Sequence, residues 1–212
     1  MRRCSVFILF FLFALSVVPA FGQSASSLTD DERKKALDYL KLTQDKFLDS
    51  IRGLSEEQWK FKPAPDRWSV AEVAEHIGIS ETTIFGMITG QVMKSPADPS
   101  KRAGAKGKED QIFKMIPDRT TKAQAPEILK PVGRWADRDS LTKEFKKNRE
   151  TAIEFVKTTK EPLRDHFGPN PVFTELDAWQ WILFMAAHSE RHTAQINEVK
   201  ADPKFPKKKS GY

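Results

Sequence analysis

The sequence predicts an all-α protein built as a four-helix bundle, with a long connection between its second and third helices. Three observations lead to this fold class. Four segments repeat apolar residues at the three- and four-residue spacing of an amphipathic helix. No segment shows a convincing alternation of apolar and polar residues, which is the pattern of a half-buried strand. One long and two shorter connections join the four segments, as in a helical bundle.

Each expected helix begins near a residue that can cap a helix and ends near a glycine, a proline or a change of pattern. The four helices are expected at residues 28–54, 69–90, 140–159 and 174–200. Residues expected to cap them are Thr29, Ser69, Thr174 and Asp177. Glu32 and Glu72 follow the first two caps by three residues, which is the spacing of a capping box.

The connection at residues 94–136 contains glycines, prolines and scattered lysines, which predict a long irregular segment. Within it, the apolar run QIFKMI (111–116) is expected to pack as a short turn onto the helices. A connection this long in a compact domain is more often functional or mobile than idle.

The N-terminus has the pattern of a secretory signal peptide. Two arginines precede an unbroken apolar run at residues 6–18, and the small residues Ala20 and Gly22 occupy positions −3 and −1 of a cleavage site. The run is shorter than the ~20 residues that span a bilayer, which argues against the alternative of a retained anchor. We therefore expect a signal peptide at residues 1–22, a domain at residues 23–212, and an exported protein, periplasmic or secreted, with no membrane anchor after cleavage.

Cysteine content and charge argue against several kinds of site and partner. The only cysteine, Cys4, lies in the signal peptide, so the mature domain has no disulfide and no thiolate ligand. The formal charge is +6, but basic and acidic residues are equal in number once the signal peptide and the basic tail at residues 200–212 are left out. We interpret this tail as a solvated, flexible terminus rather than a patch for anionic surfaces, and expect no nucleic-acid partner.

Two of the four histidines, His188 and His192, are four residues apart and share one face of the fourth expected helix. Spacing alone leaves open whether they are half of a metal site, core histidines or a surface pair. His76 is the candidate third ligand, because it lies in the apolar middle of the second expected helix. Three imidazoles with open coordination positions suit Zn, Ni, Cu or Fe and are typical of a catalytic site.

Two further residues are candidates for a role in catalysis. Gln195 lies on the face of the histidine pair and could hydrogen-bond a metal ligand or a bound water. His166 lies in the loop before the fourth helix, where it is either an ordinary loop residue or a substrate contact and general acid/base. Arg149, in the third expected helix, is interpreted as part of a solvated face.

Two stretches together carry a family resemblance. WSVAEVAEHIGISE (68–81), followed by WILFMAAHSERHTAQI (181–196), resembles the DinB-like superfamily, and LSEEQWKFKPAPDRWS (54–69) is similar to that family's linker into its second helix. The resemblance covers essentially the whole mature chain. It implies a four-helix bundle that holds a divalent metal with one histidine from helix two and two from helix four, which places the ligands here at His76, His188 and His192. It also allows a homodimer, although no exposed stripe in the sequence requires one.

These observations predict a divalent-metal-binding protein, with Zn, Ni or Fe as the metal, that acts as a metal-dependent hydrolase or transferase on an unidentified small molecule. The resemblance also implies relatives that use low-molecular-weight thiols, but these are cytoplasmic cofactors, so export favours hydrolysis. The alternative is a non-catalytic metal- or ligand-binding protein of the cell envelope, and a third reading is a metal-free structural bundle.

Overall fold

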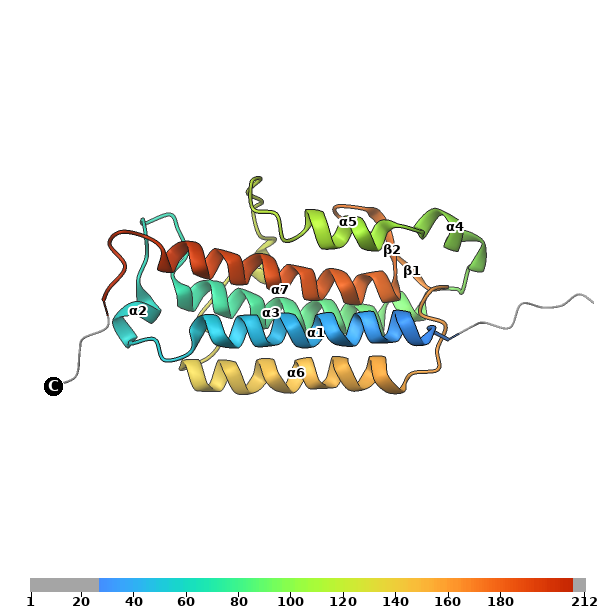
Figure 1. Cartoon of the computed structure of the whole chain (residues 1–212), viewed down its shortest axis with the longest axis horizontal. Helices are drawn as coiled ribbons and strands as arrows, with labels where there is room; N and C mark the ends of the chain where they lie inside the picture. Colours follow the sequence, from blue (N-terminus) through green and yellow to red (C-terminus); the bar gives the residue numbers. More distant parts are fainter. Residues whose placement is uncertain (1–26, 208–212) are drawn as a thin grey trace, which may run out of the picture.

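The computed structural model describes residues 27–207, so the signal peptide expected at residues 1–22 lies outside the described part of the chain. Four long helices lie side by side along the molecule (Figure 1). They are α1 (Asp30–Ile51), α3 (Val70–Gly90), α6 (Arg138–Thr158) and α7 (Ala178–Lys200). Helix α7 packs against both α1 and α3, and α6 packs against the same two helices. The expectation of a mostly helical protein is confirmed.

Shorter elements fill the connections between the long helices. They are α2 (Glu56–Lys60), η1 (Val92–Lys94), η2 (Pro99–Lys101), α4 (Arg102–Ala105), α5 (Lys108–Met115), η3 (Glu127–Leu129), β1 (Phe167–Asn170) and β2 (Thr174–Asp177). The expected apolar turn at residues 111–116 is confirmed as part of α5, which packs on α7 with Ile112 and Ile116 buried. The long connection is thus less irregular than its composition predicts.

Local capping explains where the first two long helices begin. The Thr29 side chain accepts the backbone N–H of Glu32, and the Glu32 carboxylate accepts the backbone N–H of Thr29. Ser69 and Glu72 make the same reciprocal pair at the start of α3. Both capping boxes predicted from the sequence are confirmed, because they depend only on residues within one helical turn.

The prediction of an all-α fold is wrong at one place. Residues 174–177, expected to open the fourth helix, form strand β2, which pairs antiparallel with β1. Helix α7 instead begins after Asp177, whose side chain accepts the backbone N–H of Gln180. Thr174 cannot cap the helix, because it adopts a φ of 63° at the hairpin turn. Two four-residue strands are too short to show a clear alternation in the sequence.

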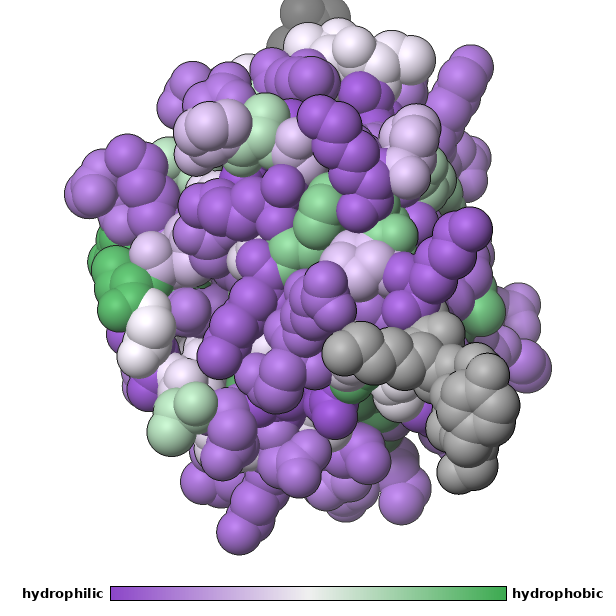
Figure 2. Space-filling model, turned by 90° about the vertical axis from the view of Figure 1, so that its left-hand side faces the viewer, coloured by the Kyte–Doolittle hydropathy of each residue, from purple (hydrophilic) through white to green (hydrophobic). Residues whose placement is uncertain are grey.

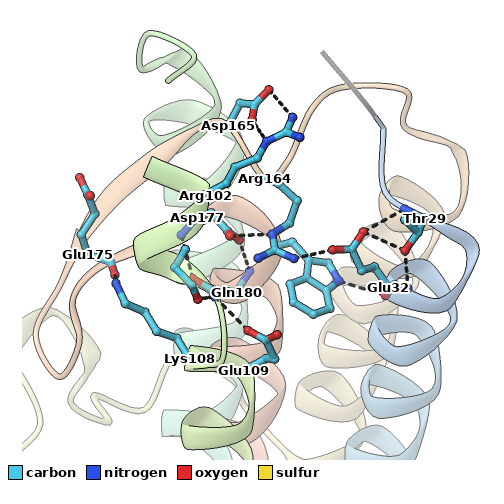
Figure 3. A network of polar contacts seen from close by, with 12 residues as sticks. Thr29, Glu32, Arg102, Lys108, Glu109, Arg164, Asp165, Glu175, Asp177 and Gln180 are labelled. Atoms are coloured by element: carbon cyan, nitrogen blue, oxygen red, sulfur yellow. Dashed lines mark hydrogen bonds and ion pairs between the residues drawn. The ribbon is translucent and has the colours of Figure 1, made fainter. Parts of the chain in front are cut away.

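Polar contacts close the end of the molecule where α7 begins (Figure 3). The Arg164 guanidinium lies between Glu32 of α1 and Asp177, and it stacks over the Trp179 ring at 4.6 Å from the ring centroid. A second ion pair joins Arg102 to the buried Asp165. These contacts fix the β-hairpin and the loop that carries it against the start of α7.

The opposite end of the molecule, near α2, is mostly hydrophilic with small separate apolar patches (Figure 2). Two residues of the basic tail make contacts here. The Lys200 ammonium donates to the Ser50 carbonyl at 2.7 Å, and the Phe205 ring meets Phe61 edge-on at 5.4 Å between centroids. Lys200 and Phe205 thus contact the residues around α1 and α2, and residues 208–212 lie outside the described range, so the flexibility of the tail stays a prediction.

Among residues 27–207, no helix combines the length and the apolar character needed to cross a bilayer.

Candidate metal centre

Three histidines from two neighbouring helices converge in the middle of the molecule. His76 projects from α3, and His188 and His192 project from one face of α7. Each offers a ring nitrogen, and these three atoms all lie within 4.8 Å of one another. The Nε2 atoms of His76 and His192 are 3.2 Å apart. The structure thus brings together the three residues that the sequence singles out as metal ligands.

Hydrogen bonds define which nitrogen of His76 and His192 is free to act as a ligand. The Nδ1 atom of His76 lies 2.7 Å from the Leu129 carbonyl oxygen, which can only accept, so Nδ1–H donates. The Nδ1 atom of His192 lies 2.8 Å from Gln195 Oε1. Arg119 also donates to that oxygen at 3.4 Å, which confirms the orientation of the amide because arginine only donates. Nε2 is the unprotonated nitrogen of both neutral rings.

This arrangement suits a cation. Two unprotonated Nε2 atoms face each other at 3.2 Å, so no hydrogen atom lies between their lone pairs. A divalent ion bound by both nitrogens replaces this repulsion with two coordinate bonds. Tetrahedral or octahedral Zn–N bonds of about 2.1 Å separate ligand nitrogens by about 3–3.5 Å, which agrees with the observed distance. The donor set therefore fits a divalent metal such as Zn, Ni or Fe.

Burial keeps the three imidazoles neutral. Burial lowers the pKa of His188 to about 3, with the neighbouring His76 acting in the same direction. Burial also lowers the pKa of His192 well below its usual value, and His188 and His76 add to this shift. The pKa of His76 is lowered by burial, against the opposing effect of its bond to Leu129. Neutral imidazole is the form that binds a metal.

The site is closed on the α3 side and more open along α7. His76 is only 1% exposed and its ring lies 5.0 Å from that of Trp68, whereas His188 and His192 are partly exposed. Phe184 stacks on His188 with ring centroids 6.5 Å apart. Ser80 follows His76 by one helical turn, and its buried Oγ has no hydrogen-bond partner among residues 27–207.

The structure separates the two candidate catalytic residues. Gln195 lies beside the three histidines and accepts a hydrogen bond from His192, while its role in catalysis stays a prediction. His166 is not part of the histidine cluster, and its role as a loop residue or a substrate contact stays a prediction. Its Nδ1 binds the Ser95 carbonyl at 2.8 Å, and its own carbonyl accepts the N–H of Ala178 at the start of α7. Ten residues of helix, about 15 Å, separate Ala178 from His188.

The sequence interpretation of Arg149 is wrong. It is not on a solvated face but fully buried among the four long helices. Its guanidinium makes a bidentate ion pair with Glu81 of α3 at 2.5 and 2.7 Å. The remaining N–H groups donate to Leu40 and Thr43 of α1 and to Ser189 of α7. Because Ser189 follows His188, this buried ion pair holds α7 at the level of the metal centre.

Three groups that contact the centre or its supports were missed from the sequence. The Leu129 carbonyl is a backbone group and carries no sequence signal. Arg119 lies in the long connection and looks like any exposed arginine until α7 is placed beside it. Glu75 had a weak signal, because a charged residue inside the apolar stretch around His76 needs a buried partner.

Comparison with known proteins identifies the family of this chain. The profile of the DinB superfamily matches residues 39–196, which include all three histidines. The uncharacterized protein YuaE of Bacillus subtilis (strain 168) is 30% identical over 150 residues, which cover 71% of this chain and 88% of that protein. No solved structure matches the chain. On the extent of the profile match and of the similarity to YuaE, the chain belongs to the DinB superfamily.

Proposed function

We propose that this protein binds one divalent metal ion through His76, His188 and His192 and uses it as a hydrolase or transferase acting on a small molecule. The observation that carries the proposal is the convergence of three neutral imidazoles, two of which face each other through unprotonated Nε2 atoms. Zn, Ni and Fe all accept this donor set. The four long helices around the centre support the four-helix bundle expected of the family.

The protein residues would divide the work as follows. His76 holds the ion from the closed side, and His188 and His192 hold it beside the more open face of α7. A divalent ion with three neutral ligands supplies Lewis acidity, which lowers the pKa of a water or thiol or polarises a carbonyl group. Phe184 packs beside His188 as an apolar wall, and Gln195 keeps His192 in its orientation.

The signal-peptide pattern at residues 1–22 leads us to propose that the mature protein works outside the cytoplasm, in the periplasm or as a secreted protein. In that location a hydrolytic reaction is favoured over one that consumes a cytoplasmic thiol. A non-catalytic metal- or ligand-binding protein of the cell envelope is the second candidate, since the same three histidines would hold the ion in it.

Metal binding is expected to stabilise the fold. Zn or Ni should raise the melting temperature of the purified, chelator-treated protein, by the equivalent of about 2.7 kcal/mol at a free-metal concentration 100 times the Kd. His188→Ala should abolish this shift, because it leaves only two ligands. His166→Ala is the matched control, since His166 lies away from the centre, and it should keep the full shift.

Elemental analysis of the purified protein supplies the second readout, with about one equivalent of metal expected. A protein that contains no metal, and whose melting temperature does not respond to added Zn or Ni, would contradict the proposal. A panel of hydrolase and transferase substrates, tested with and without metal, then separates an enzyme from a metal-binding protein without catalytic activity.

Gln195→Leu is expected to weaken metal binding about 10- to 100-fold, the usual effect of losing a group that orients a ligand. The substitution removes the acceptor of His192 Nδ1–H and leaves the ring free to rotate. Gln195→Glu retains an acceptor oxygen and should bind metal nearly as well as the wild type. Titration against a chromophoric chelator measures both variants, and equal affinities for Gln195→Leu and wild type would show that this hydrogen bond does not orient the ring.

A further inference from the structure

One segment of the long connection, residues 116–135, runs beside the metal centre and contacts both helices that carry its histidines; we call it the strap. On the α7 side, the Arg191 guanidinium donates to the backbone carbonyls of Ile116, Asp118 and Thr121. Arg119 of the strap makes a bidentate ion pair with Glu198 at 2.6 and 2.9 Å. These bonds hold the first part of the strap against α7.

The second part of the strap is held by α3. The Glu75 carboxylate accepts three consecutive backbone N–H groups, from Val132 at 2.9 Å, Gly133 at 3.1 Å and Arg134 at 2.8 Å. Gly133 adopts a φ of 75°, which turns the three N–H groups toward one acceptor and favours glycine at this position. Glu75 itself is buried, whereas the three residues that donate to it are exposed.

Both parts of the strap reach a metal ligand through its Nδ1 atom. The Leu129 carbonyl accepts directly from His76. On the other side, Arg119 holds Gln195, which accepts from His192. The orientation of two ligands therefore depends on where the strap lies. Glu75, which holds the strap, directly precedes His76 in α3. The residue that binds the strap and the imidazole that donates to the strap's Leu129 carbonyl therefore move together.

A close approach of the strap to α3 reinforces this clamp. The Trp135 indole packs on Gly78, and a Cβ atom at Gly78 would come within 2.9 Å of the ring. Gly78 lies two residues after His76, so the glycine lets the end of the strap lie against the segment of α3 that carries the ligand. The three N–H groups held by Glu75 come immediately before Trp135.

We propose that Glu75 is a positioning residue of the metal centre: by clamping residues 132–134, it holds the Leu129 carbonyl on His76 and couples closure of the strap to metal affinity. This inference rests on the proposed metal-binding function. It assigns to Glu75 an effect on metal affinity that an ordinary loop anchor does not have.

The test compares Glu75→Ala with Glu150→Ala, an exposed glutamate of α6, in the full mature chain. Zinc affinity is measured by competition with a chromophoric chelator. Hydrogen–deuterium exchange of peptides covering residues 127–135 is measured with excess chelator and with excess zinc. We expect Glu75→Ala to bind zinc 10- to 100-fold more weakly and to exchange its strap amides faster in both conditions. Zinc should slow this exchange in the wild type, and Glu150→Ala should behave like the wild type.

Glu75→Gln provides a graded variant. Its remaining oxygen can keep the bonds to Val132 and Arg134, which share Oε1, but its amide nitrogen cannot accept from Gly133. Its zinc affinity should fall between those of the wild type and Glu75→Ala. If Glu75→Ala does not fold, Gly133→Val tests the same clamp from the strap side, because it strains the positive φ and leaves α3 unchanged.

The outcomes separate the two proposals. Faster strap exchange with unchanged zinc affinity would make Glu75 a loop anchor only and would overturn the inference, while the metal site would stand. A wild-type protein that binds no zinc would overturn the proposed function, and the inference with it. Weaker zinc binding together with faster strap exchange, in both Glu75→Ala and Gly133→Val, supports the coupling.

Discussion

Arg149→Met is expected to lower the free energy of unfolding by about 3–5 kcal/mol, the usual cost of removing one partner of a buried ion pair. Both side chains of the Arg149–Glu81 pair are fully buried. The substitution leaves the Glu81 carboxylate in the interior without its counter-charge. It also removes the N–H groups that donate to the Leu40 carbonyl and to the Thr43 hydroxyl. Urea denaturation at pH 7, followed by circular dichroism, measures the change.

The double variant Arg149→Met/Glu81→Met is the informative control. It removes both buried charges and replaces them with flexible apolar side chains, so it should recover much of the lost stability. Lys157→Met, in the exposed pair with Glu154 of the same helix, should change the stability by no more than about 0.5 kcal/mol. A loss below about 1 kcal/mol for Arg149→Met would show that the ion pair is not buried as described.

Acidification is expected to destabilise the metal-free protein through the three histidines of the candidate metal centre. Burial lowers the pKa of His188 to about 3, whereas a histidine of the unfolded chain titrates near 6.5. Between these values the unfolded state takes up a proton that the folded state does not, so the free energy of unfolding falls by about 1.4 kcal/mol for each pH unit below about 6.5. From pH 6.5 to 4.5, His188 alone accounts for about 2 kcal/mol. His76 and His192 act in the same direction, since burial lowers the pKa of both.

Denaturation curves at pH 7 and pH 4.5 in excess chelator test this expectation. His188→Leu should lose less stability on acidification than the wild type, by about 2–3 kcal/mol. Asp177 opposes the trend, because burial raises its pKa to about 6 and its contribution to stability is lost as the pH rises. It is present in both proteins, so its effect cancels in their difference. Equal acid sensitivity of the two proteins would contradict the burial of a neutral His188.

The sequence predicts the long helices well because their signals are local. Thr29 with Glu32 and Ser69 with Glu72 act within one turn, and the start of α3 agrees with the predicted cap. The hairpin before α7 was missed for the opposite reason. Each of its strands has four residues. The strands are stabilised by pairing with each other and by packing against the start of α7, and neither contact leaves a periodic pattern of apolar residues in the sequence.

In the candidate metal site, too, local features could be predicted from the sequence and contacts between helices could not. The sequence by itself determined that His188 and His192 share a helix face, because helical geometry places residues four apart on one side. Only the tertiary structure decided that His76 meets them, since that contact depends on how α3 packs against α7. Only the tertiary structure also showed that His166 lies apart from the three clustered histidines and that Arg149 is in the interior. A side chain's partners across helices, and backbone acceptors such as the Leu129 carbonyl, are set by long-range packing and leave no pattern in the residues nearby.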